Sequence, residues 1–276
     1  YSPITLGQNY LGLKIINPGV SEKLEDLTIK FLDNNHILGS VQIEVKDYAN
    51  SISTGYSGDF NSDIIEFIDV DYLVVDATYT GEVAHNRIWE PQEAETELIE
   101  RITKDLSSSP VNLVADSGLL QLLVSKLNLK DKQEYIIGKK EVAHFSKVYD
   151  DIGYEQPLVV DKSTDEAKQL FKKGNYLWIG NSLADWPFDI PRGKTYIVKN
   201  FSPNNEHPIT QRSNVENMFR VSLTCHATQE DIYKYISGVN PKAVITDSSR
   251  NQNGSISLAS NIRKTLKIPA YASSVL

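Results

Sequence analysis

Two neighbouring segments alternate apolar and polar residues, and this alternation constrains the fold more than any other feature of the chain. The apolar positions are Leu27, Ile29 and Phe31 in the first segment and Val41, Ile43 and Val45 in the second. Because successive side chains of an extended chain point to opposite faces, the pattern predicts two half-buried β-strands joined by a polar turn. Two shorter strands are expected over residues 51–56 and 72–75.

After the fourth expected strand the spacing of apolar residues becomes helical. Ala94, Leu98 and Ile102 share one face of a helix. The next segment reads as a buried strand (111–115), a tight turn and an apolar helix (119–127), an order typical of parallel α/β units. Further strands are expected at 158–160, 176–179, 195–198, 219–223 and 243–246, and further helices at 229–237 and 256–266. The predicted fold class is therefore α/β.

The charge and cysteine content exclude several classes of protein. The chain has 28 Lys and Arg against 36 Asp and Glu, and its net charge of -8 argues against a generally basic surface for nucleic acid or membrane. A single cysteine, Cys225, excludes a disulfide framework and a Cys-rich zinc module, so any metal is expected on His and carboxylates. No apolar run approaches the ~20 residues that span a bilayer, so we expect a cytoplasmic protein with no membrane partner.

Familiar catalytic and phosphate-binding motifs are absent, and polar residues at strand ends take their place as candidates. The chain contains no GxxxxGK[ST], no GxGxxG after a strand, no GxSxG and no HExxH. Convergent polar groups at strand ends are where sites commonly form in α/β proteins. The candidates from three distant parts of the chain are His36, Asp59, Asp76 and His226.

Each candidate also has a purely structural interpretation. His36 could be a turn residue, Asp59 could cap a turn, and His226 could be a neutral histidine near a helix start. Asp76 directly follows a strongly apolar run, and an unpaired buried carboxylate costs several kcal/mol, so this residue needs a partner. Solvated positions are expected for His85, His144 and His207.

The order of these segments resembles the β-CASP branch of the metallo-β-lactamase fold, which includes pre-mRNA 3'-end endonucleases, ribonuclease J and DNA cross-link repair nucleases. Residues 35–40 resemble its GHxxGS segment, 56–60 its TGDF segment and 76–79 its (E/D)xTYG segment. Residues 111–127 resemble the first strand and helix of the inserted domain, and 225–242 resemble the return into the core. Each motif is short, and the specific signal is their common order.

The resemblance implies both a domain organisation and an activity. It implies a partial αββα sandwich built from residues 1–85 and 196–276, with a β-CASP domain inserted over residues 86–195. The implied activity is metal-dependent hydrolysis of phosphodiester bonds in RNA or DNA, with two zinc ions as cofactor. The implied partner is nucleic acid, and a homo- or hetero-oligomer is compatible with it.

The resemblance also implies roles for the four candidate residues. The counterpart of His36 binds zinc, and that of Asp59 bridges two metal ions. The counterpart of His226 helps to protonate the leaving group, and that of Asp76 orients the histidine. These residue types suit a two-metal phosphodiesterase, which needs a bridging carboxylate, neutral imidazoles and an acid for the departing oxygen.

Two departures from the family pattern keep the function open. The family's HxHxDH cluster has no counterpart in residues 1–35, so it is expected upstream of Tyr1 or is absent; the only methionine is Met218, which predicts sequence before Tyr1. Ser248 stands where the last metal histidine is expected, beside Asp247, and a neutral hydroxyl is a poor zinc ligand.

Three hypotheses therefore stay open. The first is a zinc-dependent nuclease whose metal site is completed by residues outside the chain. The second is a metal-free pseudo-nuclease that keeps the fold as a binding or scaffold subunit of a nucleic-acid-processing complex, as the loss of a metal ligand favours. The third is an α/β domain with no site, which the ordered motifs make less favourable.

Overall fold

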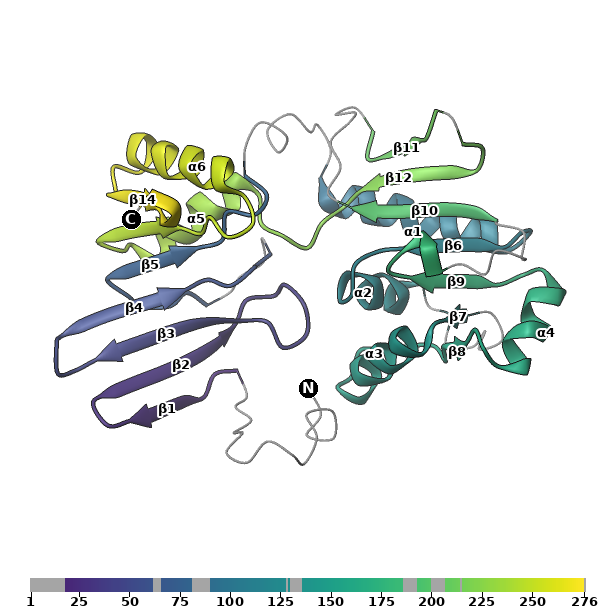
Figure 1. Cartoon of the computed structure of the whole chain (residues 1–276), viewed down its shortest axis with the longest axis horizontal. Helices are drawn as coiled ribbons and strands as arrows, with labels where there is room; N and C mark the ends of the chain where they lie inside the picture. Colours follow the sequence, from purple (N-terminus) through teal and green to yellow (C-terminus); the bar gives the residue numbers. More distant parts are fainter. Residues whose placement is uncertain are drawn as a thin grey trace. The chain divides into compact units, whose positions relative to one another are not determined.

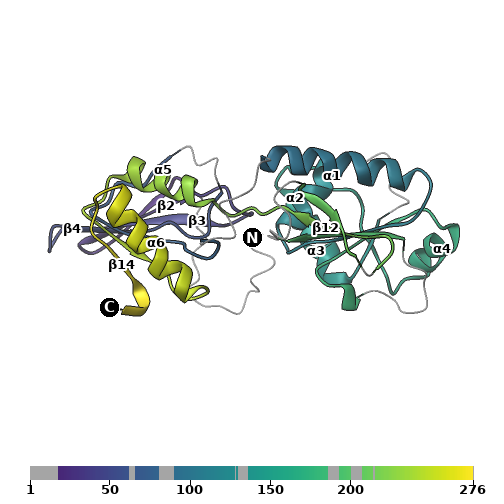
Figure 2. The ribbon, with the colours of Figure 1, turned by 90° about the horizontal axis from the view of Figure 1, so that it is seen from above.

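A computed structural model describes residues 18–61, 66–80, 90–127, 129, 136–185, 193–199, 207–213 and 215–275. The chain divides into two compact units, each with its own sheet (Figures 1 and 2). The first unit is Tyr1–Asn86 with Cys225–Leu276, and the second is Arg87–Thr224. Within the described ranges, no helix is long and apolar enough to cross a membrane.

The first unit contains a seven-stranded sheet in the order β1-β2-β3-β4-β5-β13-β14. The strands are β1 (Ser21–Leu24), β2 (Leu27–Asp33), β3 (Val41–Asp47), β4 (Ile52–Tyr56), β5 (Tyr72–Val75), β13 (Ala243–Thr246) and β14 (Ala270–Ala272). Strands β1 to β4 form antiparallel pairs, and β4, β5, β13 and β14 pair in parallel. The alternation in the sequence is thus confirmed as the β2–β3 pair.

Two helices, α5 (Gln229–Val239) and α6 (Gln252–Thr265), share one core with the sheet. Leu73 and Val75 of β5 are buried in this core, whereas Tyr72 on the opposite face is largely exposed. Helix α5 begins after Thr228, whose hydroxyl accepts a hydrogen bond from the Asp231 amide as part of a capping box. A 3₁₀ turn, η4 (Ser273–Val275), follows β14.

The opposite face of this sheet carries one row of apolar and aromatic side chains across six strands. The row runs through register partners Phe31, Ile43, Tyr56, Val74, Ile245 and Tyr271. All of them are at least partly exposed. The described residues of this unit form one sheet, and two helices pack with it in a shared core. They therefore establish an α/β class. The second sheet that an αββα sandwich requires is not found among them.

The second unit contains a sheet in the order β11-β12-β10-β6-β9-β7-β8, parallel except for the β11–β12 pair. Its strands are β6 (Val111–Val114), β7 (Ile136–Gly138), β8 (Val160–Asp161), β9 (Leu177–Gly180), β10 (Lys194–Lys199), β11 (Ile209–Gln211) and β12 (Met218–Ser222). Its helices are α1 (Pro91–Leu106), α2 (Leu119–Lys126), α3 (Lys140–Asp151) and α4 (Asp165–Lys173), with a 3₁₀ turn η3 (Leu183–Asp185). Every residue of β6 and of β9 is buried, as in strands of a sheet covered on both faces.

The second unit ends later than the sequence indicated. We expected the return to the first unit at residue 196, but the structure places it at Cys225. The reason is pairing: β10 lies between β6 and β12 in parallel register, so β10, β11 and β12 complete the second sheet.

The core of the first unit yields a stability prediction. Leu258 on α6 is 1% exposed, and Leu258→Ala should cost about 2–5 kcal/mol because it removes buried methyl groups and leaves a cavity. Ile256 on the same helix is 43% exposed, and Ile256→Ala should change stability by less than about 0.5 kcal/mol.

Urea unfolding followed by circular dichroism and by tryptophan fluorescence tests this prediction. All three tryptophans, Trp89, Trp178 and Trp186, belong to the second unit. Leu258→Ala should therefore lower the midpoint of the first unit's transition in circular dichroism and leave the fluorescence midpoint in place. Equal effects of the two alanine variants would contradict the assignment of this core.

Candidate functional site

The four candidate residues come together in the first unit. His36 lies in the turn between β2 and β3, Asp59 follows β4, Asp76 follows β5, and His226 precedes α5. Their side chains lie close together in three pairs: the rings of His36 and His226, His36 with the Asp59 carboxylate, and His226 with the Asp76 carboxylate. The structure therefore brings together residues as far apart in the chain as His36 and His226, which are separated by 190 positions.

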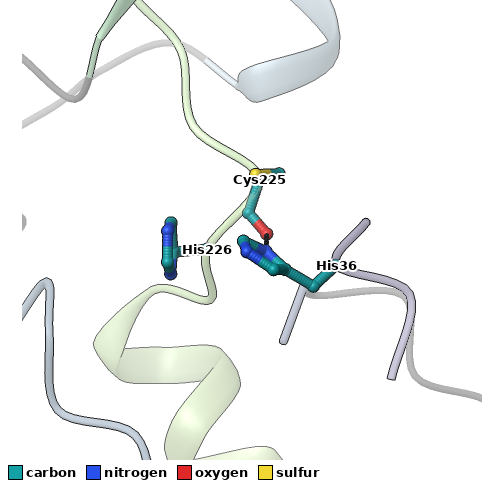
Figure 3. Close-up of side chains that lie close together, drawn as sticks. All are labelled: His36, Cys225 and His226. Atoms are coloured by element: carbon teal, nitrogen blue, oxygen red, sulfur yellow. Dashed lines mark hydrogen bonds between the residues drawn. The ribbon is translucent and has the colours of Figure 1, made fainter. Parts of the chain in front are cut away.

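His36 is 8% exposed and is held in one orientation by a backbone carbonyl. Its Nδ1 lies 3.0 Å from the carbonyl oxygen of Cys225, and Figure 3 shows that oxygen directed at the ring. Since a carbonyl only accepts, Nδ1 carries the proton, and the lone pair of the neutral ring is on Nε2. Burial, opposed by the hydrogen bond to Cys225 and reinforced by nearby His226, lowers the pKa of His36 and favours the neutral ring.

The turn that carries His36 is fixed by Asn34 beneath it. The Asn34 side chain is fully buried; its Nδ2 donates to the carbonyl of Ser57 (3.1 Å), and its Oδ1 accepts from the amide of His36 (3.4 Å). Gly58 has φ +61°, and a Cβ there would lie 2.7 Å from both Asn34 Nδ2 and the Val41 carbonyl oxygen. Glycine is therefore needed where the end of β4 passes close to this turn.

Asp76 and His226 form the most buried carboxylate–imidazole pair of the site. Asp76 is 5% exposed, and its Oδ2 lies 3.7 Å from Nδ1 of His226. Its Oδ1 accepts hydrogen bonds from the amide (2.8 Å) and the hydroxyl (2.6 Å) of Thr78. Burial raises the pKa of Asp76, but the nearby His226 and the hydrogen bonds from Thr78 outweigh it, and the net pKa is below its ordinary value. Asp76 is therefore ionised at neutral pH. The sequence indicated that this acid needs a partner, and the structure places His226 beside it.

The ring of His226 lies between two other rings. Its centroid is 4.4 Å from that of His36 and 4.4 Å from that of Tyr79, which meets it nearly edge on. The amide of Ala227 donates to the carbonyl of Phe60 at 2.6 Å, which ties the start of α5 to the segment that carries Asp59. These contacts hold the imidazole between the ends of β4 and β5.

Asp59 has a partner that the sequence analysis missed. Arg250, in the loop between β13 and α6, donates from Nη1 to Oδ2 of Asp59 at 2.9 Å. The same Oδ2 lies 3.9 Å from Nε2 of His36. Arg250 was not a candidate because it stands three positions beyond Asp247, where the sequence departs from the family pattern, and only the fold shows which acid it meets.

Ser248 and Asp247, the alternatives at the expected metal histidine, are both hydrogen-bonded. The hydroxyl of Ser248 lies 2.7 Å from that of Ser255 and accepts from the amide of Ser274 at 3.2 Å. Asp247 accepts from the amide of Ser249 (2.9 Å) and from the hydroxyl of Tyr56 (3.4 Å). Burial, with a contribution from Asp247, raises the pKa of Tyr56 to about 12, so this hydroxyl stays protonated.

Two groups of potential metal ligands meet at His226. His36, Cys225 and His226 form one, and Asp59, Asp76 and His226 form the other; within each group the ligand atoms lie within 4.8 Å of one another. The thiol of Cys225 stands beside the two histidines, so the expectation that only His and carboxylates would be available was too narrow (Figure 3).

These described donors do not fit a pair of zinc ions. Each ion takes about four ligands, and the two groups together contain five residues. Asp76 is engaged by Thr78, and Asp59 is paired with Arg250. The expected two-zinc centre therefore has too few available donors in the described part of the chain.

The remaining histidines match their expected solvated positions where they are described. His144 on α3 and His207 are exposed, and both belong to the second unit. His85 lies outside the described residues.

Neither protein-family models nor curated proteins match the chain. Among solved structures, the chain is similar to the crystal structure of a protein of unknown function from Enterococcus faecalis V583, with a TM-score of 0.56 and 10% sequence identity. The similarity covers 84% of this chain and 60% of that one, so the chain spans about three fifths of the longer protein. At this identity the similarity supports a shared α/β fold.

The pKa of Asp76 leads to a pH prediction. A carboxyl group whose pKa is lower in the folded state contributes stability above its unfolded pKa of about 3.9, and this contribution is lost as the pH falls through the folded pKa. Asp76→Asn should therefore reduce stability at pH 7 and flatten its decline below about pH 4.

Urea midpoints measured between neutral and acidic pH check this prediction. Asp26, an exposed carboxylate in the turn before β2, provides the control. The urea midpoint of Asp26→Asn should fall with decreasing pH as steeply as that of the unmodified protein. If the urea midpoint of Asp76→Asn falls with decreasing pH as steeply as that of the unmodified protein, the loss of stability in acid comes from a carboxylate other than Asp76.

Proposed function

We propose that this chain carries the acid–base part of a phosphodiester-hydrolysing site, in a nucleic-acid nuclease of the β-CASP type. The observation that carries the proposal is the meeting of His36, Asp59, Asp76 and His226, which come from four separate motifs of the sequence. A turn residue, a turn cap and a helix-start histidine with unrelated structural roles have no reason to converge in this way.

In the proposed reaction His226 donates a proton to the oxygen that leaves when the phosphodiester bond breaks. An alkoxide is a poor leaving group, so proton donation by a positioned side chain contributes about 10²–10⁴-fold to the rate. Asp76, ionised and hydrogen-bonded by Thr78, faces Nδ1 of His226 and would keep the protonated ring in place, with Nε2 as the donating atom.

The finer expectations from the sequence belong to the same proposal. They are the αββα sandwich, the nucleic-acid partner, the cytoplasmic location and, for a metal-dependent enzyme only, zinc bound through His36 and Asp59. A two-ion centre needs ligands beyond the described donors, and the HxHxDH cluster is the sequence that would supply them. The reading frame upstream of Tyr1 should therefore encode HxHxDH, and a frame without it would contradict a two-zinc enzyme.

A second candidate is a binding or scaffold subunit without turnover. The Asp59–Arg250 ion pair and the engaged hydroxyl of Ser248 favour it, because both reduce the donors available to a metal. Nucleic acid would then bind without being cleaved, through a locally basic surface, since the net charge of -8 opposes binding elsewhere.

The test is cleavage of single-stranded RNA and DNA by the unmodified protein and two alanine variants. His226→Ala should lower cleavage by about 10²–10⁴-fold with the metal content unchanged. His144→Ala, an exposed histidine of the second unit, should retain full activity.

Three outcomes separate the candidates. Cleavage that survives His226→Ala would remove the general-acid assignment. Tight binding without cleavage by the unmodified protein would favour the scaffold. A protein that neither cleaves nor binds RNA or DNA would contradict both candidates.

A further inference from the structure

We propose that Arg250 takes the place of a metal cation at Asp59, so that the centre is neutralised by the protein itself and resists zinc. The inference rests on the second candidate of the proposed function, the subunit without turnover, because a metal-dependent enzyme would need Asp59 to bridge its ions. It explains why the available donors are too few for a two-zinc centre: a fixed positive charge already satisfies the carboxylate that would hold the ions together.

The first observation is that both contacts involve one oxygen. Oδ2 of Asp59 is 2.9 Å from Nη1 of Arg250 and 3.9 Å from Nε2 of His36. The Nε2 atom holds the lone pair of His36, because Nδ1 donates to the carbonyl of Cys225. An ion placed between Nε2 of His36 and Oδ2 of Asp59 would therefore share that oxygen with the guanidinium of Arg250.

The second observation is the kind of charge involved. A guanidinium stays protonated throughout the pH range of a protein, so the competing charge is permanent. A divalent cation at Oδ2 would either displace Arg250 or lie beside another positive charge, and both reduce its affinity. The Asp59 side chain is only 19% exposed, which limits the solvent screening of that repulsion.

The third observation is that the backbone on both sides of Arg250 is anchored. On one side, the amide and hydroxyl of Ser249 donate to Asp247 at 2.9 and 3.1 Å, and the amide of Asp247 donates to the Val75 carbonyl at 2.9 Å. On the other side, Asn251 caps α6 by accepting from the amide of Gly254 at 2.9 Å. The 62% exposed side chain of Arg250 thus extends from a fixed point of the loop.

Asn251 also connects this loop to the segment that follows β5. Its Nδ2 donates to the carbonyls of Thr78 and Thr80 at 3.2 Å each. The loop that carries Arg250 is therefore held against the strand end that carries Asp76. Two residues of this loop act in one direction, since Ser248 stands where a metal histidine is expected and Arg250 supplies a cation.

Zinc titration by calorimetry, with elemental analysis of the dialysed protein, tests the proposal. The unmodified protein should retain less than one zinc per chain. Arg250→Ala should bind zinc at least about tenfold more tightly, a change of the size produced by altering groups next to a metal site. Arg250→Gln, which keeps a hydrogen-bond donor without the charge, should show the same gain and guards against misfolding of the alanine variant.

Two further variants locate the gained site. Asp59→Asn combined with Arg250→Ala should lose the gain, because the carboxylate is the proposed ligand. Arg101→Ala is the matched control: it removes another arginine that pairs with a carboxylate, Glu97, at 2.6 Å on α1, and should leave zinc affinity unchanged.

Three results would overturn the proposal. They are a stoichiometric, tightly bound zinc in the unmodified protein, no gain in either Arg250 variant, and a gain that persists without Asp59. The last would place the ion on His36, Cys225 and His226 instead. Because metal binding is the only readout, a failure of the nuclease proposal in cleavage assays remains distinguishable from a failure of this one.

Discussion

The parallel pairing of β5 with β13 is the interaction on which the candidate site depends. It joins Leu73 to Val244 and Val75 to Thr246, strands separated in sequence by the whole second unit. Because the pair is parallel, both strands end at the same edge of the sheet. Asp76 and the loop that carries Arg250 consequently emerge side by side, and the amide of Asp247 completes the pairing on the carbonyl of Val75.

Around this edge two carboxylates, Asp76 and Asp59, each have a partner and differ in their burial. Asp76 is deeply buried and keeps its charge because Thr78 and His226 compensate for lost solvation. Asp59 is nearer to solvent and is compensated by Arg250. The first pair resembles acid–base machinery, in which a carboxylate orients an imidazole. The second neutralises a carboxylate with a positive charge that the protein itself supplies.

Elements with strong periodicity were predictable from the sequence, and those whose existence depends on partners were not. The β2–β3 pair and the helix after Pro91 follow from spacing alone. Helices α3 and α4 and strand β7 lie in a lysine-rich stretch of weak periodicity, where only packing against β8 and β9 selects the structure. The end of the second unit was misplaced because β10 resembles any buried strand, and only pairing assigns it to a sheet.

The sequence by itself determined the candidate acids and histidines, because motifs at strand ends are local and can be read in order. It could not determine which partners these residues have, since partners come from segments distant in the chain. The tertiary structure alone decided that the carbonyl of Cys225 orients His36, that Asp76 faces His226, and that Arg250 satisfies Asp59. The physical reason is that the charge of a buried group is stabilised by its neighbours in space, and strand register sets those neighbours.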